Sequence, residues 1–301
     1  MKIGVIGQPG AWSTERLADA ARRQGVDAEI VDLAACSLRL PDPRLFHRGR
    51  PLEGLAGAIV KKVGDTAGGW AVRERIALLR HLEASGVPVL SEPARLDVAI
   101  DRLSMTVELA RAKLPVPETL VTEAVDEAEL GVETFGAAVL KPLYTSKGRG
   151  MRKIGPKASV DGGGDARAAL AEHRAAGDGP YYLQRFVEHP GRDLGVAVLE
   201  GRVLGAYWRR AGAGQWMTTV LSGGKYEPAS PPDEALEIAR RAAVHFGLLF
   251  TGVDIMETPE GGFIVLEVSA FGGFRGLLDA CGVDAAPLVA EAALRRFAKT
   301  A

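Results

Sequence analysis

Two acidic side chains, Asp254 and Glu267, lie within apolar stretches that are typical of the two strands of a β-hairpin. The predicted strands cover residues 250–257 and 263–269, and a glycine-containing turn at 258–262 joins them. Like charges at opposed positions of a sheet repel each other, and half-buried acids persist where a cation lies between them. Paired carboxylates with open coordination positions suit Mg²⁺ that carries a phosphate ligand. We therefore interpret the pair as a magnesium site rather than as a solvated face with Arg or Lys opposite.

The pairing of these acids depends on the position of the turn. If the loop covers 259–262, Thr258 pairs with Phe263 across the hairpin, and the two acids then face each other. Because side chains alternate between the faces of a strand, Glu267 would share a face with Phe263 and Val265. The predicted register therefore brings both carboxylates to one point of the hairpin.

A lysine and a glycine-rich loop form a second group that could do chemistry. Lys141 directly follows the predicted strand 137–140, and the loop after it contains Ser146, Lys147, Gly148, Arg149 and Gly150. Glycines allow backbone N–H groups to close on phosphate oxygens, and the cations neutralise phosphate charge. The order differs from that of a P-loop, because the lysine precedes the glycines and no helix begins there. By itself the segment is equally well explained as a basic hairpin turn, but the distant acid pair favours phosphate binding.

Composition limits the classes of function that remain. The chain has 301 residues, a net charge of −1 and interspersed acidic and basic residues, so no charged block predicts binding to nucleic acid or to a membrane surface. No apolar run approaches the roughly 20 residues of a membrane span, and the apolar stretch at 1–7 is too short for a secretory signal. The distant cysteines Cys36 and Cys281 offer neither metal-ligand spacing nor a disulfide framework. We therefore expect a cytoplasmic protein of two or three lobes.

The N-terminal part alternates strands and helices. The predicted elements are strands at 2–6, 28–33, 55–60 and 87–90 and helices at 13–24 and 70–84. This order predicts a small parallel sheet with helices on its faces, and Ser13 would cap the first helix. Gly4, Gly7 and Gly10 depart from the dinucleotide spacing G-x-G-x-x-G, which makes a nicotinamide-dependent dehydrogenase the weakest candidate.

The remainder of the chain mixes both kinds of element. The predicted helices lie at 101–113, 124–135, within 159–179, at 233–246 and at 285–298, and further strands lie at 118–122, 137–140, 181–187, 193–199 and 202–210. Pro115 and Pro117 end the first of these helices, and Gly247 ends the amphipathic helix at 233–246. The predicted fold class is therefore α/β.

Several of these segments together resemble the ATP-grasp superfamily. The matching residues are Asp101-Arg102-Leu103, Pro115-Val-Pro117-Glu-Thr119, Leu140-Lys141-Pro142, Ser146 to Gly150, Gln184-Arg-Phe186, Asp193, Asp254 and Glu267. From about residue 55 onward the chain is most similar to RimK-type glutamate ligases, and among these to members encoded beside a kinase-like protein in bacterial gene clusters. The resemblance implies an ATP-grasp fold, in which two α+β lobes clasp a nucleotide, with an N-terminal parallel-sheet pre-ATP-grasp domain. The implied boundaries are 1–97 for that domain, 98–182 for the central lid subdomain and 183–301 for the C-terminal subdomain.

The resemblance also implies a nucleotide site. Lys141 would hold the α- and β-phosphates of ATP, and Arg102 stands where the family usually has a second phosphate-binding lysine. The loop 146–150 would cover the phosphates, the segment 182–186 would bind adenine through its backbone, and Asp193 would contact the sugar. The residues implied for ATP are Arg102, Lys141, Ser146, Lys147, Gly148, Gly150, Gln184, Phe186, Val187 and Asp193.

Two of these residues have structural alternatives, and three further residues would hold the metal. Gln184 is equally explained as a polar residue at a strand edge, and Asp193 as a turn residue that caps Gly191-Arg192. The resemblance implies that Mg²⁺ bridges phosphate oxygens to Asp254, Glu267 and Ser269.

The reaction that the resemblance implies has two steps. A substrate carboxylate attacks the γ-phosphate to give an acylphosphate, and an amine then displaces phosphate to form an amide. Catalysis would rest on positioning and on cations at the phosphoryl oxygens, for which Arg209, Arg210 and Arg275 remain. Arg209 and Arg210 are otherwise explained as the solvated end of the strand 202–210. The implied partners are a small-molecule or peptide carboxylate and an amine, and a homo-oligomer is an outcome that relatives of this fold allow.

The sequence departs from the family pattern near the acceptor side. Ser269 stands where a metal-binding Asn is usual, Gly195 replaces an Arg, and Met217-Thr-Thr219 replaces Arg-x-Asn. The loss of one transition-state donor typically lowers a rate roughly 100- to 1000-fold. We therefore expect ATP and Mg²⁺ binding with an unusual acceptor. Two alternatives stay open: a nucleotide-binding regulatory protein that has lost turnover, and an ATP-grasp phosphotransferase.

Overall fold

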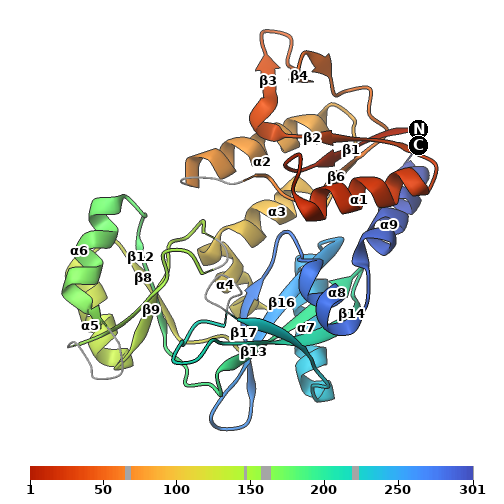
Figure 1. Ribbon diagram of the computed structural model, residues 1–301. Coiled ribbons are helices and arrows are strands. Elements are labelled where there is room, and N and C mark those ends of the chain that lie inside the picture. The colour runs from red at the N-terminus through yellow and green to blue at the C-terminus, as the bar shows by residue number, and fades with distance from the viewer. Residues whose placement is uncertain (65–68, 146–147, 157–163, 219–223, 301) are drawn as a thin grey trace.

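The N-terminal domain is built on a parallel four-stranded sheet (Figure 1). The computed structural model describes residues 1–64, 69–145, 148–156, 164–218 and 224–300. The elements of this domain are β1 (Lys2–Ile6), β2 (Asp27–Val31), β6 (Ala58–Val60), β7 (Val89–Leu90), α1 (Trp12–Arg23) and α2 (Gly69–Ala84). The strand order is β2-β1-β6-β7 and each pairing is parallel, which confirms the predicted sheet.

Alternation along β1 explains why helices cover both faces of this sheet. Val5 lies in one core cluster with Leu17 of α1, and the next residue, Ile6, lies in another with Ile76 of α2. The prediction that Ser13 caps α1 is wrong, because the helix begins one residue earlier and Ser13 lies inside its first turn.

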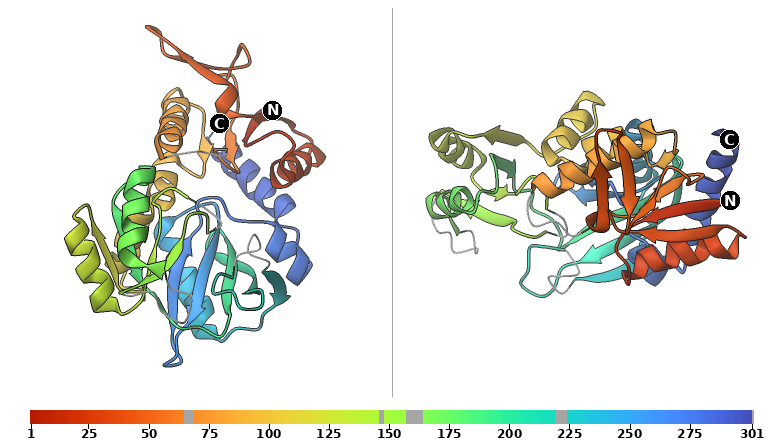
Figure 2. Two further views of the ribbon diagram at one scale, coloured as in Figure 1. Left: turned by 60° about the vertical axis from the view of Figure 1, so that its left-hand side comes forward. Right: turned by 90° about the horizontal axis from the view of Figure 1, so that it is seen from above.

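A three-stranded meander that we did not predict projects from this domain (Figure 2). It consists of β3 (Cys36–Arg39), β4 (Arg44–His47) and β5 (Arg50–Pro51). The guanidinium groups of Arg39 and Arg44 lie 4.1 and 5.5 Å from the centre of the Phe46 ring. Cation–π contacts therefore support these strands, whose lengths of four, four and two residues are too short for a clear alternating pattern.

Two helices follow β7 where we predicted one at 101–113. They are α3 (Pro93–Ile100) and α4 (Arg102–Arg111). The side chain of Asp101 separates them, because it accepts hydrogen bonds from Leu103 N at 3.1 Å and Ser104 Oγ at 2.6 Å and so caps α4. This cap fixes the start of α4 and with it the position of Arg102.

The second sheet forms a lobe of its own. Its elements are β8 (Thr119–Thr122), β9 (Ala138–Leu140), β10 (Arg152–Gly155), β11 (Gly164–Asp165), β12 (Tyr181–Arg185), α5 (Val125–Phe135) and α6 (Ala166–Ala176). The helices cover one face, where Leu140, Leu170 and Leu183 share a core, so alternation places Lys141 and Gln184 on the other face. In the order β11-β10-β9-β12-β8, strand β12 lies between two others, and the alternative of Gln184 as a strand-edge residue is therefore wrong.

The third sheet is antiparallel, with the order β15-β14-β13-β16-β17. The elements of this region are β13 (Arg192–Leu199), β14 (Arg202–Arg210), β15 (Lys225–Pro228), β16 (Phe250–Glu257), β17 (Phe263–Val268), α7 (Asp233–Phe246), α8 (Arg275–Cys281) and α9 (Ala285–Thr300). One face, with Val196 and Val253, packs against Ala239 of α7. On the other face Tyr207 packs with Leu277 of α8. The bounds of β14, α7 and β16 confirm those predicted.

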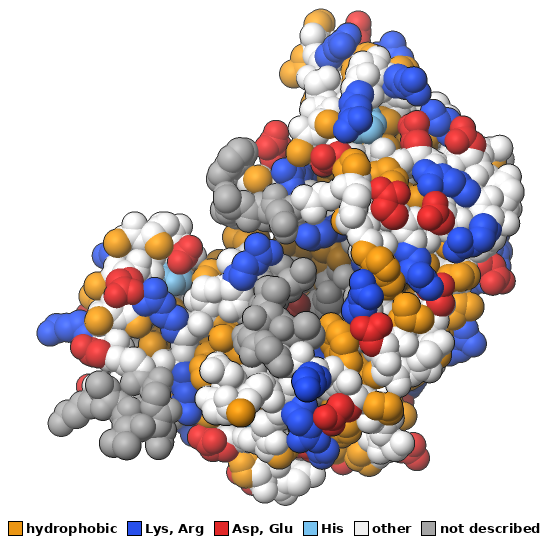
Figure 3. All heavy atoms as spheres, viewed as in Figure 1, with side chains coloured by type: hydrophobic (Ala, Val, Ile, Leu, Met, Phe, Trp, Pro, Cys, Tyr) orange, Lys and Arg blue, Asp and Glu red, His pale blue; other side chains and the backbone are white. Residues whose placement is uncertain are grey.

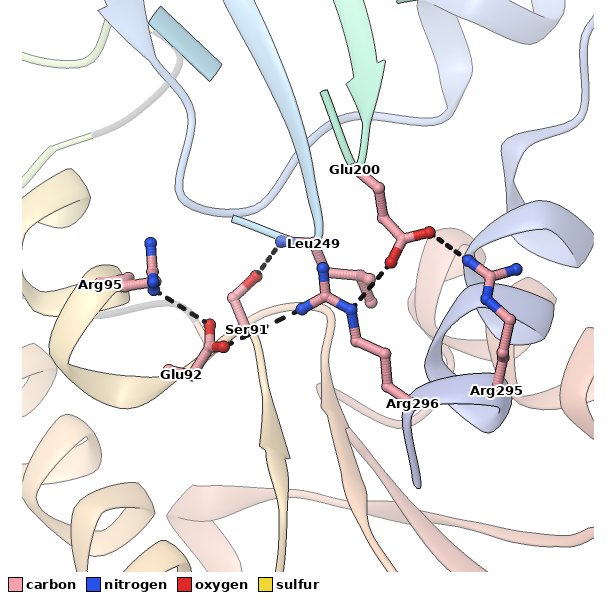
Figure 4. Close-up of polar contacts among 7 residues, drawn as sticks. All are labelled: Ser91, Glu92, Arg95, Glu200, Leu249, Arg295 and Arg296. Carbon is pink, nitrogen blue, oxygen red and sulfur yellow. Dashed lines mark hydrogen bonds and ion pairs between the residues drawn. The ribbon is translucent and has the colours of Figure 1, made fainter. Parts of the chain in front are cut away.

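Polar contacts join the N-terminal domain to the third sheet (Figure 4). Glu92 lies 3.9 Å from Arg296 of α9, and the same guanidinium binds Glu200 at 2.8 Å. The hydroxyl of Ser91 accepts a hydrogen bond from Leu249 N at 2.8 Å. Since α9 also packs against α1, the N-terminal domain rests on the third sheet, and both chain termini lie at that domain.

The space-filling view shows the surface indented between the lobe of the second sheet and the N-terminal domain (Figure 3). The predicted domain boundaries at 97 and 182 stay predictions, and β12 spans the second of them. Within the described part of the chain, no helix combines the length and the apolar character that a membrane crossing requires.

Candidate active site

Asp254 and Glu267 face each other across the hairpin, as predicted. The register that brings them together differs from the predicted one, because Glu257 rather than Thr258 pairs with Phe263. A bulge in the ladder next to Asp254 then shifts the pairing by one residue and restores the opposition of the acids. The predicted pairing of Thr258 with Phe263 is therefore wrong, whereas the opposed acids are confirmed.

The bulge also changes the face on which Glu267 lies. Val265 and Val268 both belong to the same core cluster, although side chains three residues apart in a regular strand point to opposite faces. As the neighbour of Val268, the half-buried Glu267 lies on the face opposite to Val265. The prediction that Glu267 shares a face with Phe263 and Val265 is wrong, because the bulge turns its carboxylate to the face that carries Asp254.

Arg209 lies between two carboxylates on this face. Its guanidinium binds both oxygens of Asp193, with Nε at 3.0 Å from Oδ1, and its Nη2 lies 2.8 Å from Asp254 Oδ2. Asp193 is 3% exposed, and a carboxylate at that depth without a partner would be strongly unfavourable. Within the described residues the carboxylate of Asp193 binds Arg209 and not the turn at Gly191, so the capping alternative is wrong.

The surroundings of Asp254 favour its neutral form in the absence of a further cation. Burial raises the pKa of Asp254 to about 7; Arg209 opposes this shift, and the carboxylates of Asp193 and Glu267 add to it. The opposed oxygens fit Mg²⁺, which binds one or two carboxylates and completes its shell with water and phosphate oxygens. No set of three His, Cys, Asp or Glu side chains forms a cation site among the residues that the structure covers, so a cation here would depend on such additional ligands.

Ser269 follows β17 with its backbone fixed to β16. Its N donates to Gly252 O at 2.8 Å, and its O accepts from Thr251 Oγ1 at 2.7 Å. The half-buried hydroxyl is two residues beyond Glu267, a spacing that returns to the same face of an extended chain. Its role as a third metal ligand stays a prediction.

Lys141 is buried on the open face of the second sheet. Its Nζ donates to Gln184 Oε1, and Gln184 Nε2 donates to Thr119 Oγ1 at 3.2 Å. Burial lowers the pKa of Lys141 to about 7; repulsion from Arg102 contributes, and the carboxylate of Glu267 opposes the shift. An anion beside this ammonium would therefore strongly favour its charged form.

The acid pair and Lys141, which are distant in sequence, belong to one site. Glu267 is near enough to Lys141 for its carboxylate to act on the pKa of the ammonium, although the two residues lie on different sheets. A backbone hydrogen bond of 2.8 Å from Val265 N to Pro115 O holds β17 against the segment that enters the second sheet. The fold therefore brings a buried ammonium and an opposed acid pair into electrostatic contact, and their phosphate- and metal-binding roles stay predictions.

Arg102 supports the loop that follows Lys141. Its guanidinium donates to the carbonyl oxygens of Pro142 and Thr145, the latter at 3.0 Å, and the residue is 7% exposed. These contacts hold the start of the loop against α4. Its implied contact with phosphate stays a prediction.

The implied phosphate loop is described only in part. Ser146 and Lys147 lie outside the described residues. Gly148 and Gly150 have φ angles of 73° and 72°, which glycine adopts without strain. Side chains at these two positions would therefore strain the loop.

Phe186 belongs to a cluster of aromatic and basic side chains beyond β12. Lys153 Nζ lies 3.7 Å from the centre of the Phe186 ring, and the rings of Trp216 and His189 lie 6.0 and 5.9 Å from it. The Trp216 ring meets Phe186 edge-on and the His189 ring is tilted to it, and aromatic faces beside a cation suit a planar base that carries phosphates. Our sequence analysis missed Lys153, whereas it assigned Phe186 to the adenine hinge at 182–186 and Val187 to the ATP site, and both assignments stay predictions.

The three arginines predicted to be catalytic do not lie together. Arg209 is part of the acid cluster. Arg210 lies on the opposite face of β14, where its side chain is 47% exposed and binds Glu227 at 3.0 Å. Arg275 stacks on Trp12, with its guanidinium carbon 4.0 Å from the ring centre. The geometry therefore favours Arg209, and catalytic roles for all three stay predictions.

A tyrosine that our sequence analysis missed lies beside the acid cluster. Tyr207 is on the same face as Arg209, and a Cβ at Gly195 would come within 2.7 Å of its ring, and one at Gly276 within 2.4 Å. Burial raises the pKa of the Tyr207 phenol, so its hydroxyl is protonated at neutral pH. The signal in the sequence that could have pointed to this packing was Gly195, because a glycine inside a strand often marks a close approach of another group. In the structure Gly195 pairs with both Tyr207 and Asp254.

This packing predicts a coupling between Gly195 and Tyr207. Gly195→Ala should lower the free energy of unfolding by about 1–3 kcal/mol, because the new methyl group overlaps the ring. In a Tyr207→Leu background the same substitution should cost less than about 0.5 kcal/mol. Urea denaturation of the four proteins of this cycle measures both values, and equal costs in the two backgrounds would contradict the packing.

Comparison with solved structures identifies the fold. A RimK domain ATP-grasp protein from Sphaerobacter thermophilus matches with a TM-score of 0.75 at 23% identity, over 98% of this chain and 100% of that one. The ATP-grasp ligase PsnB, complexed with its minimal precursor, Mg and ADP, matches with a TM-score of 0.69 at 23% identity, over 98% of both chains. The three sheets are therefore those of an ATP-grasp protein with its N-terminal domain.

Comparison of sequences identifies the family. Residues 1–96 match the RimK PreATP-grasp domain, and residues 99–293 match the RimK-like ATP-grasp domain. A tetrahydromethanopterin:alpha-L-glutamate ligase from Methanosarcina acetivorans is 32% identical over 326 aligned positions, which cover 96% of this chain and 98% of that protein. A probable alpha-L-glutamate ligase from Thioalkalivibrio sulfidiphilus is 29% identical over 95% of this chain and 93% of that protein. The chain belongs to the RimK-like ATP-grasp family, as the resemblance implied.

Proposed function

We propose that this protein is an ATP- and Mg²⁺-dependent carboxylate–amine ligase that acts through an acylphosphate. The observation that carries the proposal is that buried Lys141 of one sheet interacts electrostatically with Glu267 of another, where Glu267 is opposed by Asp254, within an ATP-grasp fold. The family match and the relatives named as glutamate ligases support the reaction class. The Mg and ADP in the PsnB complex support the cofactors.

Four residues of the chain have distinct roles in the proposed reaction. Lys141 neutralises phosphate charge, and Asp254 and Glu267 offer hard oxygen ligands for Mg²⁺. Arg209 holds Asp254 in place and, with Nη2 2.8 Å from Asp254 Oδ2, is a cation positioned to stabilise a transferring phosphoryl group. When bound, Mg²⁺ supplies Lewis-acid stabilisation of phosphate oxygens. Binding geometry and fixed charge therefore account for the catalysis that phosphoryl transfer requires.

The names of the relatives suggest which amine substrate to test. The departures from the family pattern concern the carboxylate substrate that accepts this amine. L-Glutamate is the first amine to test, because it appears in the names of the matched ligases. Gly195 and Ser269 stand where the family usually has larger polar side chains, so we propose a carboxylate acceptor of different shape, either a small molecule or a peptide. We propose action in the cytoplasm, which the free thiols of Cys36 and Cys281 support. A homo-oligomer stays a prediction.

Mass spectrometry of the products tests the reaction class. The protein is incubated with ATP, Mg²⁺, L-glutamate and a panel of carboxylic acids and peptides, and ADP release is followed in parallel. We expect ADP and phosphate with an acceptor heavier by one amide-linked residue. A stable phosphorylated product would identify a phosphotransferase instead, and Mg·ADP binding without any turnover would favour the regulatory alternative.

Nucleotide binding should take up a proton at Lys141. The pKa of the free ammonium is about 7, and phosphate oxygens would raise it, because an opposite charge favours the charged form. At a pH between the pKa of Lys141 in the free protein and its higher pKa in the complex, the complex holds more protons than the free protein. The affinity for ADP should therefore fall as pH rises above 7, by up to about tenfold per pH unit. Calorimetry in two buffers of different ionisation enthalpy measures this uptake. Lys141→Met should reduce it, and the same uptake in both proteins would contradict the assignment.

A further inference from the structure

Lys61 is a buried lysine to which the proposed reaction assigns no task. It directly follows β6 at the carboxyl end of the parallel sheet and is 7% exposed. Its Nζ donates a hydrogen bond to Gly272 O at 2.8 Å and lies 4.6 Å from the centre of the Phe274 ring. A cation of the N-terminal domain therefore holds two points of the segment 270–274, which connects β17 to α8.

The surroundings of Lys61 are mostly apolar. Leu90, Phe250 and Phe271 line a cavity of about 20 Å³ beside it, which has room for one water molecule. Burial lowers the pKa of Lys61 to about 8, and within the described residues no carboxylate pairs with it. A buried ammonium is unfavourable unless its donors are satisfied. The contacts with the carbonyl and the ring face are therefore the ones that offset its burial.

The segment that Lys61 holds begins directly after the proposed metal ligands. The backbone of Ser269 is fixed to β16, where Thr251 Oγ1 donates to Ser269 O at 2.7 Å. Gly272 packs against the same strand, since a Cβ there would lie 2.6 Å from the Phe250 ring and 2.9 Å from the carbonyl carbon of Thr251. With β16 on one side and the ammonium of Lys61 on the other, the segment has little freedom to move.

We propose that Lys61 is a positioning residue for the magnesium site. By holding Gly272, Lys61 connects the interface between the N-terminal domain and the third sheet to the end of β17. This contact fixes Glu267 and Ser269 relative to Asp254. This inference rests on the proposed function for the identity of the metal site. Partners that hold metal ligands in place typically change metal affinity about 10- to 100-fold when they are removed.

Lys61→Met tests the proposal, because it keeps the length of the side chain and removes the charge and the donors. Ser91→Ala is the matched control: it removes another buried hydrogen bond of the same domain junction, to Leu249 N, which lies before β16 and not in the segment 270–274. Lys61→Arg retains a cation and serves if Lys61→Met does not fold. The probes are ADP with Mg²⁺ titrated by calorimetry, and amide hydrogen exchange without nucleotide.

For Lys61→Met we expect the Mg²⁺ concentration that half-saturates the ADP complex to rise about 10- to 100-fold, with binding of ADP in EDTA nearly unchanged. Amide exchange should become faster at 269–274 and stay unchanged in β13 and β14. Lys61→Arg should give a smaller shift of the same kind, whereas Ser91→Ala should change neither quantity. Equal behaviour of Lys61→Met and Ser91→Ala would overturn the proposal. Where Lys61→Met does not fold, faster exchange at 269–274 in Lys61→Arg with an unchanged Mg²⁺ requirement would overturn it.

The two measurements also separate this inference from the proposed function. The exchange experiment needs no nucleotide, so it tests the hold of Lys61 on 269–274 by itself. A wild-type protein that binds no Mg·ADP would refute the proposed function and with it the magnesium role of Lys61. A wild-type protein that binds Mg·ADP, with no change in Lys61→Met, would refute only the inference about Lys61.

Discussion

Replacing Lys141 with Ala should lower the rate of ATP turnover about 100- to 1000-fold, the loss that follows removal of one transition-state donor. The ammonium is buried, so the charge that it offers to phosphate is poorly screened by water. The substitution also leaves Gln184 Oε1, which accepts from Nζ, without this donor. Steady-state ADP release with saturating ATP and Mg²⁺ measures the loss, and calorimetry with ADP measures the accompanying loss of affinity.

A surface lysine provides the control for this substitution. Lys225 is exposed on β15, and Lys225→Ala should leave both ADP release and ADP affinity within about twofold of the wild type. Far-UV circular dichroism checks that Lys141→Ala keeps its secondary structure. Turnover by a folded Lys141→Ala protein within a few-fold of the wild type would show that phosphate binds elsewhere.

Replacing Glu267 with Gln should change stability and activity in opposite directions. Without metal and at a pH above 7, where Asp254 is ionised, removal of one of two opposed like charges should raise the free energy of unfolding by up to about 1 kcal/mol. With ATP and Mg²⁺, loss of a carboxylate ligand should lower turnover about 100- to 1000-fold, on the scale of other lost transition-state contacts. Urea denaturation in EDTA and ADP release at increasing Mg²⁺ measure the two effects. If Glu267 had only a structural role, Glu267→Gln would lower the free energy of unfolding and leave the dependence of ADP release on Mg²⁺ unchanged. That result would contradict the prediction.

The matched control lies on the same hairpin. Glu257 ends β16 and pairs with Arg192 at 3.0 Å. Glu257→Gln removes an equal charge from the same hairpin, but from an ion pair instead of an opposed acid, so it should slightly lower the free energy of unfolding and leave the magnesium dependence unchanged. If both variants shift the magnesium requirement equally, net charge and not ligation by Glu267 is responsible.

The sequence alone predicted the parallel sheet and the opposed acids, because both depend on strong local patterns. Alternating apolar and polar residues and a clear amphipathic helix defined β14, β16 and α7 to the residue. The register of the hairpin failed, since a β-bulge has no mark in the pattern of apolar residues. Asp254 and Glu267 still oppose each other because the bulge and the misplaced turn shift the register by one residue each and cancel.

Long-range contacts account for most of what the sequence could not predict. The pairing of Arg209 with Asp193 and Asp254 requires the order of three strands, which pattern analysis does not provide. The same holds for Tyr207, which occupies space left by glycines from two distant segments. Arg210 was grouped with Arg209 because adjacent residues look equivalent in a sequence, whereas alternation in β14 sends them to opposite faces.

The most direct measurement of the central claim is a crystal structure with a non-hydrolysable ATP analogue and Mn²⁺, with anomalous data collected for the metal. We predict an anomalous peak about 2 Å from carboxylate oxygens of both Asp254 and Glu267, with the phosphates of the nucleotide within hydrogen-bond distance of Lys141 Nζ. A peak that contacts neither acid, or a nucleotide whose phosphates lie away from Lys141, would contradict the account.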